Sequence, residues 1–293
     1  MLTRRRFNTT LSTAIGFLLA GRSTMASPSS PPFAEDMKQL ESKSGGRLGV
    51  AVLDTKDGSL LQHRGDERFP MCSTFKLLAA AAVLKGSGDD LAGLRRRVHF
   101  EKTDLVTYSP QTEKHVGGEG MSLAEICEAA VTLSDNTAGN LMLKNIGGPE
   151  GLTAFARSLG DQITRLDRIE PDLNEAVPGD PRDTTSPAAM AANVRKLLLG
   201  DALNEAARDQ LTRWLVANKT GDTRLRAGLP HGWRVGDKTG TGRLGTNNDV
   251  AIIWPTSRPP LIVACYLTGS TLEMGAQNEI IASIGRTVGA AFG

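Results

Sequence analysis

Residues 47–64 read RLGVAVLDTKDGSLLQHR, and this stretch decides the fold class. Apolar residues dominate 47–54, a run typical of a strand, and 55–58 carries the Thr-Lys-Asp-Gly composition of a tight turn. A second extended segment follows over 59–64. The pattern predicts a β-hairpin, preceded by an amphipathic helix over residues 33–44.

Strand patterns return only near the other end of the chain, over residues 234–240, 249–254 and 261–268, before a final helix over 277–291. Between the two strand regions the periodicity is mostly helical, with helix-start signals at Ser122-x-x-Glu125, a capping box, and at Ser186-Pro187. Short strands seek neighbours, so the end segments are expected to pair into one antiparallel sheet. The predicted fold class is α/β (α+β), a five-stranded antiparallel sheet flanked by helices, with an inserted all-helical subdomain.

This organisation predicts an α/β subdomain made of residues 27–66 and 218–293. An all-helical subdomain is expected over 67–217, including an aperiodic loop at 168–185. The cleft between two such parts is the natural place for a binding site.

The first 26 residues resemble an export signal. Arg4, Arg5 and Arg6 precede a short apolar run over 11–21, and small residues near Ala26 suit a signal peptidase. The arginine arrangement resembles a twin-arginine signal, with an ordinary arginine-rich secretory signal as the alternative. We expect a periplasmic or secreted bacterial protein.

Charge and composition exclude several functions. The formal net charge is +2, and removing residues 1–26 with their four arginines and no acids leaves −2, so a polyanion-binding role is not expected. The sequence contains no run of about 18 consecutive apolar residues, so we expect no membrane anchor. The four histidines lack ligand spacing, so neither a metal nor another cofactor is expected. We expect a monomer whose partner is a small molecule.

Ser73-Thr74-Phe75-Lys76 is the first motif with chemical content, and it opens an apolar helical run. A serine and a lysine three residues apart share one helix face, so the amine can lie beside the hydroxyl. The helix N-terminus also favours negative charge on the serine oxygen. Alone, this short pattern is common by chance, and a capped helix with a solvated lysine is the favoured explanation.

Two further motifs strengthen the catalytic interpretation. Ser134-Asp135-Asn136 lies between two predicted helices, where its simpler role is an N-cap. A Lys-Ser/Thr-Gly triplet occurs three times, but the copies at 43–45 and 219–221 are interpreted as helix ends. Only Lys238-Thr239-Gly240 lies on a predicted strand, where Gly240 is expected to let a substrate approach the backbone. The fourth element is the segment 168–174, which carries Glu170 in a long loop.

Together these motifs resemble the class A serine β-lactamases, for which Ser-x-x-Lys, Ser-Asp-Asn and Lys-Thr-Gly form a signature. The resemblance covers essentially the whole mature chain, including Tyr108-Ser109-Pro110 and Asp183-Thr184-Thr185. It implies the fold shared by β-lactamases and penicillin-binding proteins. It also implies hydrolysis of penicillins and cephalosporins through a serine acyl-enzyme, an activity that confers antibiotic resistance.

Position by position, the resemblance implies a catalytic set and a binding set. The catalytic set comprises Ser73 as nucleophile, Lys76 as its neighbouring amine, Ser134 as the proton relay to the leaving nitrogen, and Glu170 as the activator of the deacylating water. The implied substrate contacts are Tyr108, Asn136, Asn174, Arg224, Lys238, Thr239, Gly240 and Thr241. An oxyanion hole is expected from the backbone N–H groups of Ser73 and Thr241, and an ion pair between Arg168 and Asp183 is expected to clamp the loop.

Some alternatives stay open at this point. Either Lys76 or Glu170 acting through water can serve as the acylation base. A penicillin-binding DD-peptidase shares the three short motifs, but the loop with Glu170 argues against it. A β-lactam sensor domain is a further rival, against which the lack of an attached membrane span argues.

Departures from common family patterns concern the substrate carboxylate and the cysteines. Many relatives carry an arginine where this chain has Asn247, so Arg224 is expected to supply that charge, with Arg226 pointing the other way. The resemblance places Cys127 opposite Ala80 instead of a second cysteine, so Cys72, Cys127 and Cys265 are all expected to be free. Gly242 replaces the disulfide cysteine of some carbapenem-hydrolysing relatives, which makes carbapenem hydrolysis doubtful.

Overall fold

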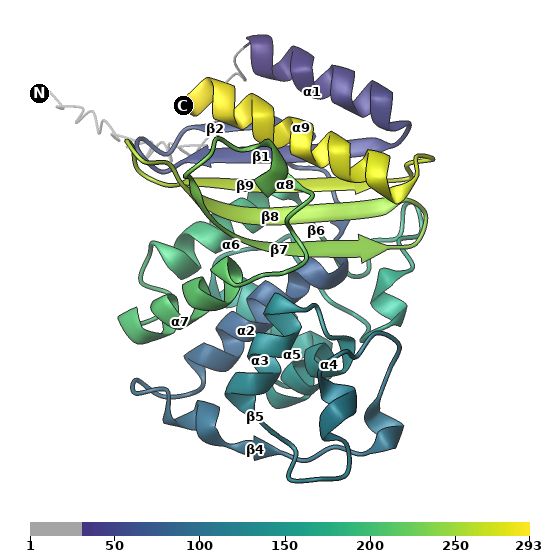
Figure 1. Ribbon diagram of the computed structural model, residues 1–293, viewed down its shortest axis with the longest axis vertical. Helices are drawn as coiled ribbons and strands as arrows, with labels where there is room; N and C mark the ends of the chain where they lie inside the picture. The colour runs from purple at the N-terminus through teal and green to yellow at the C-terminus, as the bar shows by residue number, and fades with distance from the viewer. Residues whose placement is uncertain (1–30) are drawn as a thin grey trace, which may run out of the picture.

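The computed structural model describes residues 31–293 (Figure 1). The predicted export signal over 1–26 lies outside the described residues. Within them, no helix combines the length and apolar character needed to cross a membrane.

The core of the fold is a five-stranded antiparallel sheet in the order β2-β1-β9-β8-β7, which confirms the predicted sheet. Its strands are β1 (Arg47–Asp54), β2 (Leu60–His63), β7 (Arg234–Gly242), β8 (Thr246–Trp254) and β9 (Leu261–Thr268). The two ends of the chain therefore meet in one sheet, as the strand patterns indicated. Strand β7 forms the edge nearest the helical part of the molecule (Figure 1).

Helices cover both faces of this sheet. On one face, α1 (Pro31–Ser44), α8 (Leu225–Gly228) and α9 (Met274–Phe292) enclose a core that includes Leu48, Val263 and Ile281. On the other face, α6 (Pro187–Leu198) packs against β1 and β9, and α7 (Glu205–Val216) packs against β7. Because α6 and α7 pack directly on the sheet, they join the helical part to it.

The helical part is built around α2 (Phe75–Lys85), which is buried along nearly its whole length. It is surrounded by α3 (Leu123–Thr132), α4 (Asn136–Asn145), α5 (Gly148–Ser158) and α7. A helix that is apolar on every side belongs inside a core. The boundaries of the helical subdomain at 67–217 stay a prediction.

Local helix signals act as the sequence indicated. Ser122 and Glu125 form a reciprocal capping box at the start of α3. Ser186 caps α6 through the N–H of Ala189, with Pro187 at the first helical position.

Two short strand pairs were not predicted. Strand β3 (Phe69–Pro70) pairs with β6 (Thr184–Thr185), and β4 (Arg97–Val98) pairs with β5 (Met121–Ser122). Two residues are too few to show a period of two in the sequence. The first pair matters for the site, because it ties the end of loop 168–185 to the segment just before Ser73.

Candidate active site

Ser73 lies in a single 3₁₀ turn, Cys72–Thr74, that leads directly into α2. The residue before it, Cys72, has a φ of +45°, a backbone conformation that residues other than glycine rarely adopt. Such strain persists where the surrounding structure imposes it, and it is common at active sites. The turn leaves Ser73 7% exposed, at the floor of a cleft.

Lys76, one helical turn after Ser73, is fully buried and connects three parts of the chain. Its Nζ donates to Ser73 Oγ at 3.0 Å, to the carbonyl oxygen of Ser134 at 2.9 Å and to Asn136 Oδ1 at 2.7 Å. It also lies 2.9 Å from Glu170 Oε1. The amine therefore has a fixed position beside the nucleophile, as the Ser-x-x-Lys spacing predicted.

Glu170 reaches the same serine from the loop. Ser73 Oγ lies 3.3 Å from Glu170 Oε1, and Asn174 donates its side-chain amide to Glu170 Oε2. The carboxylate is buried, so its contacts fix its direction. One hydroxyl thus has an amine and a carboxylate within hydrogen-bond reach, which is the geometry required of candidate bases.

Asn140 on α4 holds the main chain of Glu170, a role that the sequence did not reveal. Its Oδ1 accepts the Glu170 N–H at 2.9 Å, and its Nδ2 donates to the Glu170 carbonyl at 3.0 Å. The contact spans 30 residues of sequence, and an asparagine inside a helix carries no local signal of such a contact.

The loop itself is closed by the expected ion pair. Arg168 Nε donates to Asp183 Oδ2 at 2.6 Å, and Asp183 Oδ1 accepts the backbone N–H groups of Asp167 and Arg168 at 2.8 and 2.9 Å. Asp183 is almost fully buried. Since this carboxylate binds both the side chain and the main chain, it closes the loop that carries Glu170.

The Lys-Thr-Gly motif faces the cleft from β7. Lys238 Nζ donates to Ser134 Oγ at 3.0 Å and to the carbonyl of Thr239 at 3.0 Å. Burial, and then the nearby Lys76 charge, hold the pKa of Lys238 well below its ordinary value, while Asp237 opposes this shift. The two lysines therefore flank Ser134, the residue expected to relay a proton.

The structure gives Gly240 a packing role in addition to the expected one. A Cβ at this position would lie 2.7 Å from the carbonyl oxygen of Met71 and 3.1 Å from Thr74 Cγ2. The glycine is thus needed because β7 packs closely against the turn that carries Ser73. The expected role of Gly240 in letting a substrate approach the backbone stays a prediction.

Thr220 is a further residue of the cleft that the sequence analysis set aside. Its triplet was interpreted as a helix end, but α7 ends earlier, at Val216. Thr220 Oγ1 lies 2.5 Å from Thr239 Oγ1 and also donates to Asn218 Oδ1 at 2.9 Å. It therefore fixes the hydroxyl of Thr239 from the side.

Arg224 and Arg226 point to different surroundings, as expected, but neither is a solvated loop arginine. Arg224 is 6% exposed, and its Nη2 donates to Thr241 Oγ1 at 2.7 Å. Arg226 instead pairs with the buried Asp237, with 2.5 Å between Nε and Oδ1. Arg226 therefore has a structural contact of its own.

The polar groups converge on a cleft of about 400 Å³. Tyr108, 57% exposed, stands at its rim, and its carbonyl accepts the N–H of Asn136 at 3.0 Å. The lining residues are Ser73, Tyr108, Ser134, Asn136, Asn174, Thr220, Arg224, Thr239 and Thr241. All of the binding residues implied by the resemblance line this cleft except Lys238 and Gly240, which lie buried in β7 beside it.

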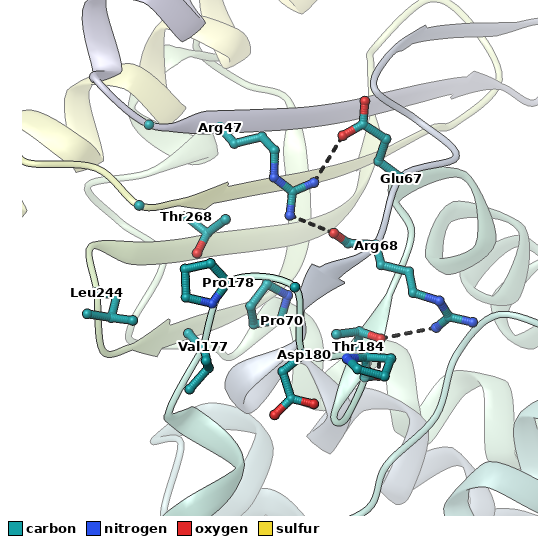
Figure 2. Close-up of a pocket in the computed structure, with 15 residues that line it drawn as sticks. Arg47, Glu67, Arg68, Pro70, Val177, Pro178, Asp180, Thr184, Leu244 and Thr268 are labelled. Carbon is teal, nitrogen blue, oxygen red and sulfur yellow. Dashed lines mark hydrogen bonds and ion pairs between the residues drawn. The ribbon is translucent and has the colours of Figure 1, made fainter.

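A second cavity of about 460 Å³ is lined in part by residues 176–181 of the loop 168–185 (Figure 2). Val177, Pro178 and Leu244 supply apolar surface, and Arg47 at its wall is already engaged with Glu67 and with the Arg68 carbonyl. Its lining holds no serine, cysteine or lysine that could act as a nucleophile. The cleft at Ser73 is therefore the better candidate for catalysis.

The three cysteines are free and buried, as expected. Burial raises the pKa of the thiol in each case. Cys72 thus behaves as a small core residue beside the nucleophile. Within residues 31–293, no three His, Cys, Asp or Glu side chains gather in a way that could hold a metal ion.

Comparisons with known proteins agree with this geometry. Residues 32–292 match the family model described as the beta-lactamase enzyme family. Beta-lactamase CTX-M-97 of Escherichia coli is 52% identical over 254 residues, 87% of each chain, and beta-lactamase OXY-1 of Klebsiella oxytoca is 50% identical over 94% of each. An ancestral (GNCA) class A beta-lactamase structure superposes with a TM-score of 0.86 at 64% identity, covering 89% of this chain and 100% of that one.

Proposed function

This chain belongs to the class A β-lactamases, and on that premise we propose that it hydrolyses penicillins and cephalosporins through an ester on Ser73. One observation carries the proposal: Ser73 Oγ lies 3.0 Å from Lys76 Nζ and 3.3 Å from Glu170 Oε1. A serine hydroxyl is a weak nucleophile near neutral pH and needs an adjacent base. Here two candidate bases converge on a single hydroxyl.

In the acylation step, Ser73 Oγ attacks the β-lactam carbonyl carbon while its proton passes to Lys76, or to Glu170 through water. The C–N bond of the ring then breaks, and Ser134 delivers a proton to the departing nitrogen. The contact between Lys238 and the Ser134 hydroxyl supports this relay, and Lys76 holds the backbone carbonyl of the same residue. Backbone N–H groups of Ser73 and Thr241 are assigned to the carbonyl oxygen, where negative charge develops.

Deacylation is assigned to Glu170. An ester at Ser73 would persist without a base for water, and Glu170 Oε1 lies beside the ester oxygen. Asn174 binds the other oxygen of the same carboxylate, so the pair can orient one water molecule. This step makes the protein a hydrolase and not a permanently acylated trap.

We assign the carboxylate of the substrate to one end of the cleft, which is formed by Arg224, Lys238, Thr239 and Thr241. The Thr241 hydroxyl, which lines the cleft, accepts from Arg224 Nη2 at 2.7 Å, so the guanidinium lies one hydrogen bond from the bound substrate. We assign Asn136 to the binding of the substrate's side-chain amide. Tyr108 is assigned to a contact with the substrate at the rim of the cleft.

The rival functions receive less support. A DD-peptidase needs no carboxylate that reaches the nucleophile, whereas Glu170 is held at both its side chain and its main chain. A sensor domain would stay acylated, which the same carboxylate opposes. We further propose that the protein is an exported, monomeric bacterial enzyme that confers β-lactam resistance.

Steady-state hydrolysis of benzylpenicillin, a cephalosporin and a carbapenem tests the proposal. The chain should turn over the first two and act poorly on the third, and Ser73→Ala should abolish all turnover. Peptidase activity on a D-alanyl-D-alanine peptide, with no turnover of either drug, would contradict the proposal.

A further inference from the structure

Asp249 is a buried carboxylate that the mechanism above does not use. It lies on β8 directly opposite Thr239 of β7, and residues paired across a sheet point to the same face. Thr241 and Asp237, two residues away from Thr239 on the same strand, share that face as well. Asp249 therefore lies beside the threonines assigned to the substrate carboxylate, on the sheet face that α8 and α9 cover (Figure 1).

The contacts of Asp249 connect it to the segment that carries Arg224. Asp249 Oδ2 accepts the backbone N–H of Leu225, the first residue of α8, at 3.2 Å. Arg224 is the residue that precedes this helix. Asp249 Oδ1 finds no hydrogen-bond partner among residues 31–293, although the side chain is fully buried. A buried carboxylate oxygen without a partner costs free energy and calls for an explanation.

Arg224 shows the complementary deficit. Its Nη1 donates to the carbonyls of Gly240 and Asn248 at 3.1 and 2.7 Å, and its Nη2 donates to Thr241 Oγ1. In the described part of the chain these partners are all neutral, and Nε has none. The buried guanidinium of Arg224 therefore lies among neutral acceptors. The Asp249 carboxylate binds the backbone N–H of the next residue, Leu225.

Arg224 and Asp249 are buried groups of opposite charge type in the same region. Arg226 is neutralised by its direct ion pair with Asp237, which leaves Arg224 and Lys238 opposed by Asp249. Burial lowers the pKa of Arg224, and Asp249 is the charge that most opposes this. Burial and then Asp237 raise the pKa of Asp249, whereas Arg224 lowers it. Each of the two groups therefore opposes the effect of burial on the pKa of the other.

We propose that Asp249 is a positioning residue for substrate recognition: it anchors the backbone of Arg224 and Leu225 and supplies the buried counter-charge that keeps the Arg224 guanidinium aimed at Thr241. This inference rests on the proposed carboxylate-binding role of Arg224. Asp249 itself does not touch the substrate, so its effect should appear only with substrates that carry a carboxylate.

The test compares the hydrolysis of benzylpenicillin with that of its uncharged methyl ester by the exported enzyme. Asp249→Asn removes the charge but retains a side-chain oxygen that can accept the Leu225 N–H. We expect kcat/KM for benzylpenicillin to fall about tenfold, mainly through a higher KM, while kcat/KM for the ester changes less than twofold. Hydrolysis of the ester also reports that the variant is folded.

Arg224→Ala and the double variant separate the two proposals. If Asp249 acts through Arg224, Asp249→Asn should cost little more once Arg224 is alanine. If Arg224→Ala lowers kcat/KM for benzylpenicillin and for the ester by the same factor, the role of Arg224 is overturned. A different result would overturn the role of Asp249 alone: Arg224→Ala lowers kcat/KM for benzylpenicillin more than for the ester, whereas Asp249→Asn lowers both values equally or leaves both unchanged.

Discussion

The side chain of Asn140 binds the main chain of Glu170 at both of its polar groups, through hydrogen bonds of 2.9 and 3.0 Å. This pair joins α4 of the helical part to the loop that carries Glu170, to which we assign deacylation. The direction of Glu170 toward Ser73 therefore depends on a residue that touches neither the nucleophile nor the cleft.

Replacing Asn140 by alanine should slow deacylation. Small displacements of a catalytic group cost on the order of 10- to 100-fold in rate, so we expect kcat for benzylpenicillin to fall by about that factor while acylation persists. Pre-steady-state kinetics would show a burst followed by slow turnover. Asn204→Ala is the control, because Asn204 caps α7 and should cost about 1 kcal/mol of stability with kcat unchanged. Equal effects on kcat from both variants would refute the positioning role.

The ion pair between Arg168 and Asp183 should stabilise the fold as well as the loop. Asp183→Asn keeps a side-chain oxygen for the backbone N–H groups but loses the charge that faces Arg168. Hydrogen bonds to charged groups contribute about 1.5–3 kcal/mol, so the free energy of unfolding should fall by about 2 kcal/mol. Urea unfolding measures this. Asp180→Asn, which breaks a pair at the surface of the same loop, should leave stability unchanged.

Arg224→Ala should lower kcat/KM for penicillins roughly tenfold, about 1.4 kcal/mol of lost transition-state binding. Arg226 is unsuitable as the comparison, since its removal would leave the buried Asp237 carboxylate without its partner. Arg234 is the better control, because it lies exposed at the other end of β7, with its guanidinium over the Trp254 ring. Small and equal losses from Arg224→Ala and Arg234→Ala would return the carboxylate site to Lys238 and Thr239.

The cysteines should titrate as three thiols once the protein is denatured without reductant. All three are buried, and burial raises their pKa values, so the native protein should react with a thiol reagent only slowly. A count of one thiol after denaturation would indicate a disulfide and contradict the assignment.

The sequence predicted the features that depend on local pattern. The strands that build the sheet, the caps at Ser122 and Ser186, and the spacing that joins Ser73 to Lys76 all have signals within a few residues. The expected sheet is confirmed, and the ion pair of Arg168 with Asp183 is present.

The features that the sequence did not predict depend on contacts between distant segments. Asn140 meets Glu170 across 30 residues, and Thr220 meets Thr239 across 19. Nothing local shows that the Cα of Gly240 packs against Met71. The two-residue pair of β3 with β6 likewise forms only because the loop returns to the segment before Ser73.

The account depends most on the division of labour between Ser73 and Glu170. Intact mass spectrometry after mixing with benzylpenicillin tests it directly. Glu170→Ala should accumulate a stable adduct of one penicillin per protein, because acylation proceeds and deacylation stalls, while Ser73→Ala should show no adduct. A Glu170→Ala enzyme that shows no adduct and still turns over benzylpenicillin at the normal rate would contradict the account.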